Sequence, residues 1–267
     1  MTYDVGQDEL VEEMKIGIMG AMAEEVSLLR AHMLDARSES RGMREYVTGK
    51  IHGQEVTLVF SRWGKVAASS TATTLIERHG VDCLIFTGVA GAVDPALNVG
   101  DIVVADTLVQ HDMDVSALPD IERFEIPLLG IDRFIVDKSY VDAARRAAED
   151  YLENTLRSDV PAGVLDEFHI TTPKVFTGTI ASGNQFIADN EIARNLRESL
   201  PGLQCIEMEG AAVAQVAYEH NVPCVVLRTI SDKADHSAAV DFPRFVEKVA
   251  SHFTCGSVLH LLKLIGR

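Results

Sequence analysis

Five acidic residues stand close to points where the sequence predicts β-strands to end. They are Glu24, Glu25, Glu207, Glu209 and Asp232. Carboxylates that share one pocket can be held at different pKa values, so that one serves as an acid and another as a base. Such a set suits cleavage of a glycosidic bond, in which positive charge develops on the sugar ring. Taken one at a time, however, each acid is explained more simply as a solvated side chain or as part of a helix start, where an acid complements the helix dipole.

The elements that would position these acids alternate between strands and helices along most of the chain. Apolar and β-branched runs predict strands at residues 15–20, 55–61, 83–87, 101–105, 174–180, 204–207 and 223–228. Helical spacing of apolar residues and runs of small residues predict helices after residue 20 and at 66–78, 139–156, 189–199, 210–217 and 242–253. Residues 106–135 are irregular and are expected to form loops.

This alternation predicts an α/β fold: a single-domain three-layer αβα structure with a central mixed, largely parallel twisted sheet. Ligands in such folds bind beyond the carboxyl ends of the strands. The segments after Gly20, Thr87, Glu207 and Arg228 should therefore surround one cleft, and the candidate chemistry is expected there.

The length and composition of the chain limit the kinds of partner that it can bind. The chain has 267 residues and a net charge of −16, which argues against binding a phosphate backbone and hence against a nucleic-acid partner. The four cysteines form no C-x-x-C pair and are expected to be reduced. Residues 1–14 form an acidic extension before a domain at 15–267, and neither a secretory signal nor a membrane span is predicted. These features predict a cytoplasmic protein, and they leave the role of the extension open.

The sequence contains none of the short motifs that indicate other common enzyme reactions. No P-loop, G-x-G-x-x-G, G-x-S-x-G or H-E-x-x-H pattern occurs, so triphosphates, dinucleotides, acyl-serine chemistry and zincin chemistry are not indicated. His111-Asp-Met-Asp114 could bind a metal, as could the acids and histidine of 232–236, but neither has a second ligand cluster at a fixed spacing. We therefore expect no metal and no organic cofactor.

Six motifs occur in the order found in 5′-methylthioadenosine/S-adenosylhomocysteine nucleosidases, which belong to the purine nucleoside phosphorylase/uridine phosphorylase superfamily. They are Gly20-Ala-Met-Ala-Glu-Glu25, Ser61-Arg-Trp-Gly-Lys-Val-Ala-Ala68, Thr87-Gly-Val-Ala-Gly91, Val99-Gly-Asp-Ile-Val-Val104, Ile206-Glu-Met-Glu-Gly-Ala-Ala212 and Arg228-Thr-Ile-Ser-Asp232. The chain resembles this family from roughly Met14 to Leu264. The last two motifs are specific to the superfamily, and the first points to its hydrolytic branch.

The resemblance implies hydrolysis of the N-glycosidic bond of methylthioadenosine and S-adenosylhomocysteine. In that reaction Glu25 would be the general base that activates water. Glu209 would accept hydrogen bonds from the ribose hydroxyls, which should strengthen as the sugar becomes oxocarbenium-like. Asp232 would donate a proton towards N7 of adenine, for which a raised pKa is needed.

The resemblance also implies contacts to the small-molecule substrate. Phe186 and Ile187 match the segment that stacks on adenine and bonds it through the backbone, although core packing would explain Phe186 equally well. Met208 would lie against the ribose, and Arg228 would orient Glu209. Met22 matches a residue beside the pocket for the 5′-substituent, whose preferred identity the sequence leaves open. The remaining substrate-binding residues that it implies are Val89, Ala90, Gly91, Glu207 and Ser231.

Three residues depart from the family pattern. Val89 stands where these nucleosidases often carry a serine, which removes a hydroxyl near the attacking water. Trp63 stands where a smaller aliphatic residue is expected, and it could reshape the pocket wall or a subunit contact. Arg62 beside it is also unexpected.

Alternatives stay open within and beyond this chemistry. A purine nucleoside phosphorylase would need cations for phosphate, which Arg41, Arg44 or Arg62 could supply. The loop after the first strand carries Glu25 and no arginine, so hydrolysis is favoured. A nucleosidase that prefers 5′-deoxyadenosine or aminodeoxyfutalosine, and a nucleoside-binding protein without catalysis, are the other possibilities. The resemblance further implies a homodimer, with residues 109–129 as a candidate contact surface.

Overall fold

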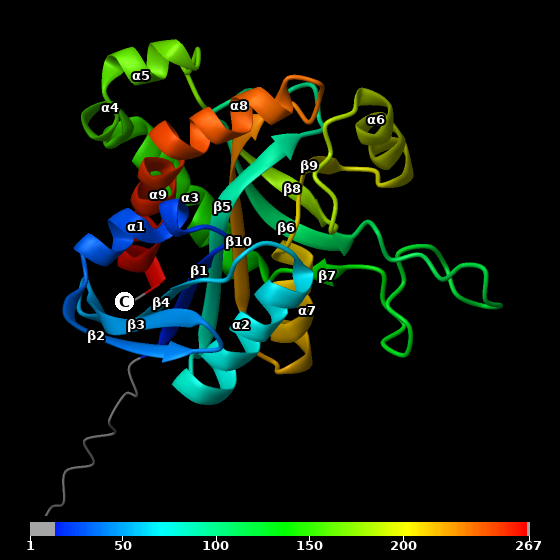
Figure 1. Cartoon of the computed structure of the whole chain (residues 1–267), viewed down its shortest axis with the longest axis horizontal. Helices are drawn as coiled ribbons and strands as arrows, with labels where there is room; N and C mark the ends of the chain where they lie inside the picture. Colours follow the sequence, from blue (N-terminus) through cyan, green and yellow to red (C-terminus); the bar gives the residue numbers. More distant parts are fainter. Residues whose placement is uncertain (1–13, 266–267) are drawn as a thin grey trace, which may run out of the picture.

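Strand β5 (Cys83–Ala92) runs through the middle of the sheet in the computed structural model, which describes residues 14–265. Its neighbours β1 (Ile16–Gly20) and β10 (Cys224–Asp232) both run parallel to it. All three strands are buried along nearly their whole length, which is why they appear in the sequence as continuous apolar runs. Figure 1 shows these strands at the centre with helices on either side.

Among the described residues, ten strands form one sheet. Beyond β1 the sheet continues through β4 (Gln54–Phe60), β3 (Arg44–Ile51) and β2 (Leu34–Arg41), the last three of which are antiparallel neighbours. On the other side of β5, strand β10 pairs antiparallel with β6 (Ile102–Gln110), which also pairs with the short β7 (Phe134–Ile135).

The sheet then curls back on itself. Strand β6 pairs with β8 (Val175–Ser182), β8 pairs with β9 (Leu203–Glu207), and the tip of β9 pairs antiparallel with the tip of β5. Strands β5, β10, β6, β8 and β9 therefore form a closed ring of pairings. This closure brings the end of β9 to the same place as the ends of β1, β5 and β10.

Helices cover both faces of the sheet. They are α1 (Ala23–Ala31), α2 (Lys65–His79), α3 (Lys138–Asn154), α4 (Leu156–Asp159), α5 (Ala162–Glu167), α6 (Asn190–Ser199), α7 (Gly210–Glu219), α8 (Ala238–Phe245), the π-helical turn η1 (Val246–Ala250) and α9 (Ser251–Ile265). Alternate residues of β5 point to opposite faces. Leu84 and Phe86 pack in a core with α2 and α7, and Ile85 packs in another core with α1, α3 and α9. The predicted three-layer architecture is confirmed.

The sequence-based expectations differ from the structure in several stretches, one of which is the unpredicted pair of short helices α4 and α5. Residues 106–110 continue β6, and Phe134–Ile135 form β7, so only the part between them is loop as predicted. The hairpin of β2 and β3 was not predicted, because most of β2 is exposed and shows no apolar alternation. The predicted acidic extension lies outside the described residues except for Met14. Within residues 14–265 no helix is long and apolar enough to cross a bilayer.

Candidate active site

A pocket opens where the ends of β1, β5, β9 and β10 meet. It encloses about 590 Å³ of space, including its opening to solvent. Every site residue that the family resemblance implies lines it, with the exception of Arg228, whereas Glu24, a candidate acid by its position in the sequence, does not. The full lining is Ala21, Met22, Glu25, Trp63, Val89, Ala90, Gly91, Gln185, Phe186, Ile187, Ile206, Glu207, Met208, Glu209, Ser231, Asp232 and Phe242.

Glu25 is buried at the start of α1, and its carboxylate is held by backbone N–H groups. Oε2 accepts hydrogen bonds from Ala21 at 2.6 Å and Met22 at 2.9 Å, and Oε1 accepts one from Val89 at 3.2 Å. Because Val89 contributes its backbone, the absence of a serine hydroxyl at this position leaves this contact intact. Gly88 makes room for the carboxylate, since a Cβ there would lie 2.4 Å from Oε1.

The environment of Glu25 makes it a better base than an ordinary glutamate. Burial raises its pKa from 4.5 to about 6, although the charge of Arg228 and the three backbone N–H groups oppose this rise. A carboxylate with this pKa is ionised at neutral pH and still accepts a proton readily.

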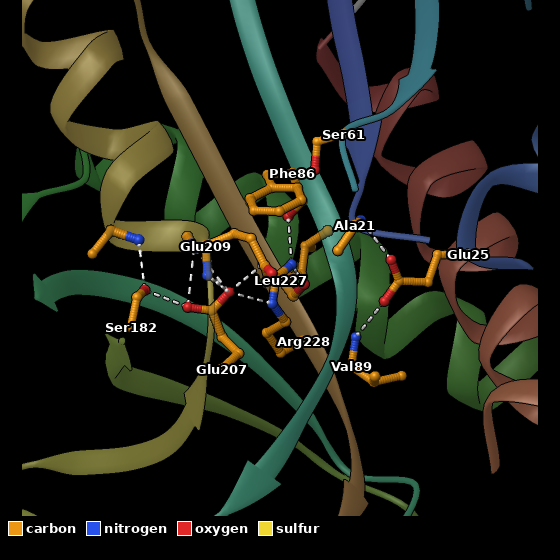
Figure 2. A network of polar contacts seen from close by, with 12 residues as sticks. Ala21, Glu25, Ser61, Phe86, Val89, Ser182, Glu207, Glu209, Leu227 and Arg228 are labelled. Carbon is orange, nitrogen blue, oxygen red and sulfur yellow. Dashed lines mark hydrogen bonds and ion pairs between the residues drawn. The ribbon is translucent and has the colours of Figure 1, made fainter. Parts of the chain in front are cut away.

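Glu207 and Glu209 have separate environments although one residue lies between them. Arg228 donates to Glu207 from Nη2 at 2.6 Å and from Nε at 3.2 Å, and Glu207 also accepts from Gly210 N at 2.8 Å and from the Ser182 hydroxyl. Figure 2 shows Arg228 and Ser182 both joined to Glu207. The prediction that Arg228 orients Glu209 is wrong, because its hydrogen bonds go to Glu207 and to backbone carbonyls.

Glu209 accepts its hydrogen bond from the other side of the pocket. The N–H of Gly64, at the start of α2, donates to Oε1 at 2.7 Å. Gly64 has φ +90°, a conformation that glycine adopts far more readily than other residues. Burial, together with the nearby Glu207 carboxylate, raises the pKa of Glu209. The Glu209 carboxyl group lines the pocket, and its oxygens can accept more hydrogen bonds than the one from Gly64.

Asp232 reaches the pocket through an irregularity in β10. Pairing with β5 is regular up to Ile230, then skips Ser231 and resumes with Asp232 opposite Gly91. The Ser231 hydroxyl donates to Asp232 Oδ2 at 2.8 Å, and Ala234 N donates to Oδ1 at 2.8 Å. Burial raises the pKa of Asp232 against the effect of these two hydrogen bonds. A carboxyl group in this environment is suited to hold a proton.

Three aromatic side chains form one wall of the pocket. Phe242 of α8 lies edge-on to Trp63 and to Phe186, with ring centroids 6.2 Å and 5.5 Å apart. Phe186 is 44% exposed and Trp63 is 58% exposed, so neither is a core residue. The sequence analysis missed Phe242 as a site residue, because its spacing indicated only one face of an amphipathic helix.

The segment His111–Asp114, a metal candidate by sequence, takes part in a different arrangement. Asp112 Oδ1 accepts from Lys65 Nζ at 2.5 Å, and its Oδ2 accepts from Asn184 N at 3.0 Å. Asn184 Oδ1 in turn accepts from Lys65 N at 2.9 Å. These three bonds tie the start of α2, which holds Glu209, to the loop that carries Phe186. Within residues 14–265 no cluster of three or more metal-ligating side chains occurs.

The arginines considered for phosphate lie elsewhere. Arg44 donates to the carbonyls of Ser61 and Gly42, and Arg41 pairs with Glu39. Neither these nor Arg62 is among the residues that line the pocket, and in the described part of the chain its lining contains no lysine or arginine.

Comparison with known proteins agrees with this geometry. The Phosphorylase superfamily profile matches residues 15–263. A 5′-methylthioadenosine/S-adenosylhomocysteine nucleosidase of Shewanella loihica is 36% identical over 94% of this chain and 99% of its own length. The chain belongs to this nucleosidase family of the phosphorylase superfamily.

Solved structures of the nucleosidase family and a related hydrolase have the same fold. The Neisseria meningitidis nucleosidase in complex with methylthio-immucillin-A matches with a TM-score of 0.82 and 30% identity, covering 94% of this chain and 99% of that one. The native futalosine hydrolase of Helicobacter pylori matches with a TM-score of 0.79 and 34% identity, covering 94% and 98%.

Proposed function

We propose that the protein hydrolyses the N-glycosidic bond of 5′-methylthioadenosine and S-adenosylhomocysteine, releasing adenine and the 5′-thio-substituted ribose. The observation that carries this proposal is a pocket lined by three buried carboxyl groups without an ion pair, Glu25, Glu209 and Asp232, beside the paired Glu207, and by no cation among the described residues. The names of the relatives support the choice of substrates.

Glu25 is the general base in this proposal. Three backbone N–H groups fix its carboxylate, and its pKa of about 6 lets it take a proton from a water molecule at neutral pH. A base held in one orientation lowers the activation barrier of hydrolysis, because it also holds the attacking water in a productive position.

Asp232 acts on the departing adenine, and Glu209 acts on the ribose. Asp232 supplies a proton towards N7, which makes adenine a better leaving group. Glu209 accepts hydrogen bonds from the ribose hydroxyls, and these bonds strengthen as positive charge develops on the ring. Met208 lies against the ribose, and Phe186 and Ile187 contact the base.

Two alternatives differ in how well the site supports them. Phosphorolysis requires an anion to bind beside Glu25 without a cation in the described lining, so it is disfavoured. A nucleosidase acting on aminodeoxyfutalosine or 5′-deoxyadenosine would use the same three acids. The likeness to futalosine hydrolase makes aminodeoxyfutalosine the second candidate substrate.

We further propose that the protein works as a homodimer in the cytoplasm. The segment between β6 and β7 projects from the sheet (Figure 1) and exposes Leu118 and Leu128. Apolar side chains on a projecting loop are suited to a subunit contact. The four cysteines are free, as expected in a reducing compartment.

One assay tests substrate class and reaction type together. The protein is incubated with methylthioadenosine with and without phosphate, and the sugar product is identified. We expect adenine and free methylthioribose at the same rate in both conditions. A phosphate requirement with a ribose 1-phosphate product would contradict hydrolysis.

A further inference from the structure

The motif Val99-Gly-Asp-Ile-Val-Val104 has no part in the proposed chemistry, yet it contains a buried acid. Asp101 is 2% exposed and lies in the turn between β5 and β6. Its Oδ2 accepts a hydrogen bond from Asn98 N and its Oδ1 accepts one from Lys174 N, both at 2.7 Å. Asp101 N in turn donates to the Asn98 carbonyl at 3.0 Å. The carboxyl group, which needs such partners because it is buried, therefore closes the turn formed by residues 97–101.

The same turn holds the chain just before the proposed acid. Gly100 N donates to the Ile230 carbonyl at 2.9 Å, and Ile230 N donates to the Asp101 carbonyl at 2.8 Å. Ile230 is the last residue of β10 that pairs regularly with β5, before Ser231 is skipped and Asp232 resumes the pairing. The irregularity in β10 thus begins at a residue that the turn fixes by two backbone hydrogen bonds.

Lys233 holds the chain on the other side of Asp232. Its Nζ donates to the Leu97 carbonyl and lies 3.4 Å from Asn98 Oδ1. The Asp232 carboxyl group takes no part in these contacts, and its own hydrogen bonds come from its neighbours in the chain. The turn therefore grips the chain before the acid through backbone bonds, and after the acid through the Lys233 side chain.

A grip on both sides matters because Asp232 follows an irregularity in the strand. A β-bulge re-aims a side chain and leaves one residue without its pairing partner. For proton transfer, the Asp232 carboxyl group must lie within hydrogen-bonding reach of the departing base. A displacement on the order of 1 Å can cost about 10²-fold in rate. The position of this strand end therefore bears directly on the reaction.

We propose that Lys233 is a positioning residue for Asp232, acting from the turn that Asp101 closes. Lys233 does not line the pocket, so it acts on the reaction only through the place that it gives to the carboxyl group of its neighbour. This inference rests on the proposed hydrolysis and deepens it by naming a residue outside the pocket on which departure of the base depends.

Lys233→Met tests the proposal, because it removes the ammonium donor and keeps an apolar chain in its place. We expect about a tenfold lower kcat for methylthioadenosine and less than about a twofold change in KM, since the substrate still binds while the acid is displaced. Lys233→Arg keeps a cationic donor and should lie closer to wild type. Lys138→Met is the matched control, because Lys138 is an exposed lysine at the start of α3 that pairs with Asp142. It should keep the wild-type kcat.

A double-mutant cycle with Asp232→Asn separates positioning from a general effect on the fold. Two substitutions that act through the same group are not additive. In the Asp232→Asn background, Lys233→Met should therefore cost less than about twofold more, measured as adenine release in a single turnover. Thermal unfolding of each variant shows that the proteins compared are folded.

An unchanged kcat in Lys233→Met, or an equal loss in the wild-type and Asp232→Asn backgrounds, would overturn the positioning role. If the wild-type protein releases adenine from neither natural substrate, the proposed function itself is wrong. That result differs from an active wild-type protein whose rate does not depend on Lys233.

Discussion

Arg228 and Glu207 form a buried ion pair, with Nη2 and Oε2 2.6 Å apart and both side chains almost fully inaccessible. The guanidinium also lies over the ring of Phe86, 4.2 Å from its centroid. Both Glu207 and Glu209 line the pocket, but the Glu207 carboxylate is paired with Arg228, whereas the Glu209 carboxyl group accepts a hydrogen bond from the Gly64 N–H.

Arg228→Met should destabilise the fold, because it leaves Glu207 buried without its partner. We expect a loss of about 3–5 kcal/mol in the free energy of unfolding, measured by denaturant titration. Arg30→Met is the control: Arg30 pairs with Glu45 at 2.7 Å on the surface, and its loss should cost about 0–1 kcal/mol. Equal effects of the two substitutions would contradict the structural role given to the buried pair.

Asp232→Asn should retain the fold and lose activity. An amide cannot supply the proton to the departing base, so adenine release should fall by about 10²–10⁴-fold, followed by the absorbance change of adenine release. Asp35→Asn changes an exposed acid of β2 that does not line the pocket, and it should stay close to wild type. Near-normal turnover by Asp232→Asn would remove this residue from the mechanism.

The pH dependence of kcat/KM should reflect Glu25. A base must be ionised, and the pKa of Glu25 is about 6 rather than 4.5, so activity should fall as the pH drops below about 6 instead of below 4.5. The decline should approach about tenfold per pH unit. Glu25→Gln should bind substrate better than it turns it over. An acidic limb centred near pH 4.5, or equal losses of binding and turnover, would argue against a buried base.

Gly88→Ala should reduce activity by displacing the base. The new Cβ would lie 2.4 Å from Glu25 Oε1, so the carboxylate must move, and a shift of this kind can cost about 10²-fold in rate. We expect the loss in kcat rather than in KM. Gly163→Ala, where no atom lies within 4 Å of the new Cβ, is the control. An unchanged kcat in Gly88→Ala would mean that the position of Glu25 is not critical.

The pocket could be located from the sequence because the strands that end at it are strongly apolar. Continuous runs such as Cys83–Thr87 mark buried parallel strands, and the residues after them must gather at one edge. The positions of Glu25, Glu209 and Asp232 on one pocket were therefore predictable.

Other features depend on contacts that the sequence does not encode locally. The two glutamates of Glu207–Glu209 look equivalent in the chain, and only the closed ring of strands decides which one meets Arg228. Phe242 has the spacing of an ordinary amphipathic helix, and its place in the pocket follows from where α8 packs. The hairpin of β2 and β3 escaped prediction because it buries little of β2.

The skipped residue in β10 makes the length of this strand as important as its composition. Side chains alternate between the two faces of a strand, and Ser231 adds one position between Ile230 and Asp232 without a partner on β5. If pairing continued without this irregularity, Ser231 would lie opposite Gly91 and the Asp232 side chain would turn to the face of Ile230. A residue inserted into β10 or removed from it before Ser231 would therefore change which residue lies opposite Gly91, whereas a point substitution at Ser231 would leave this register unchanged.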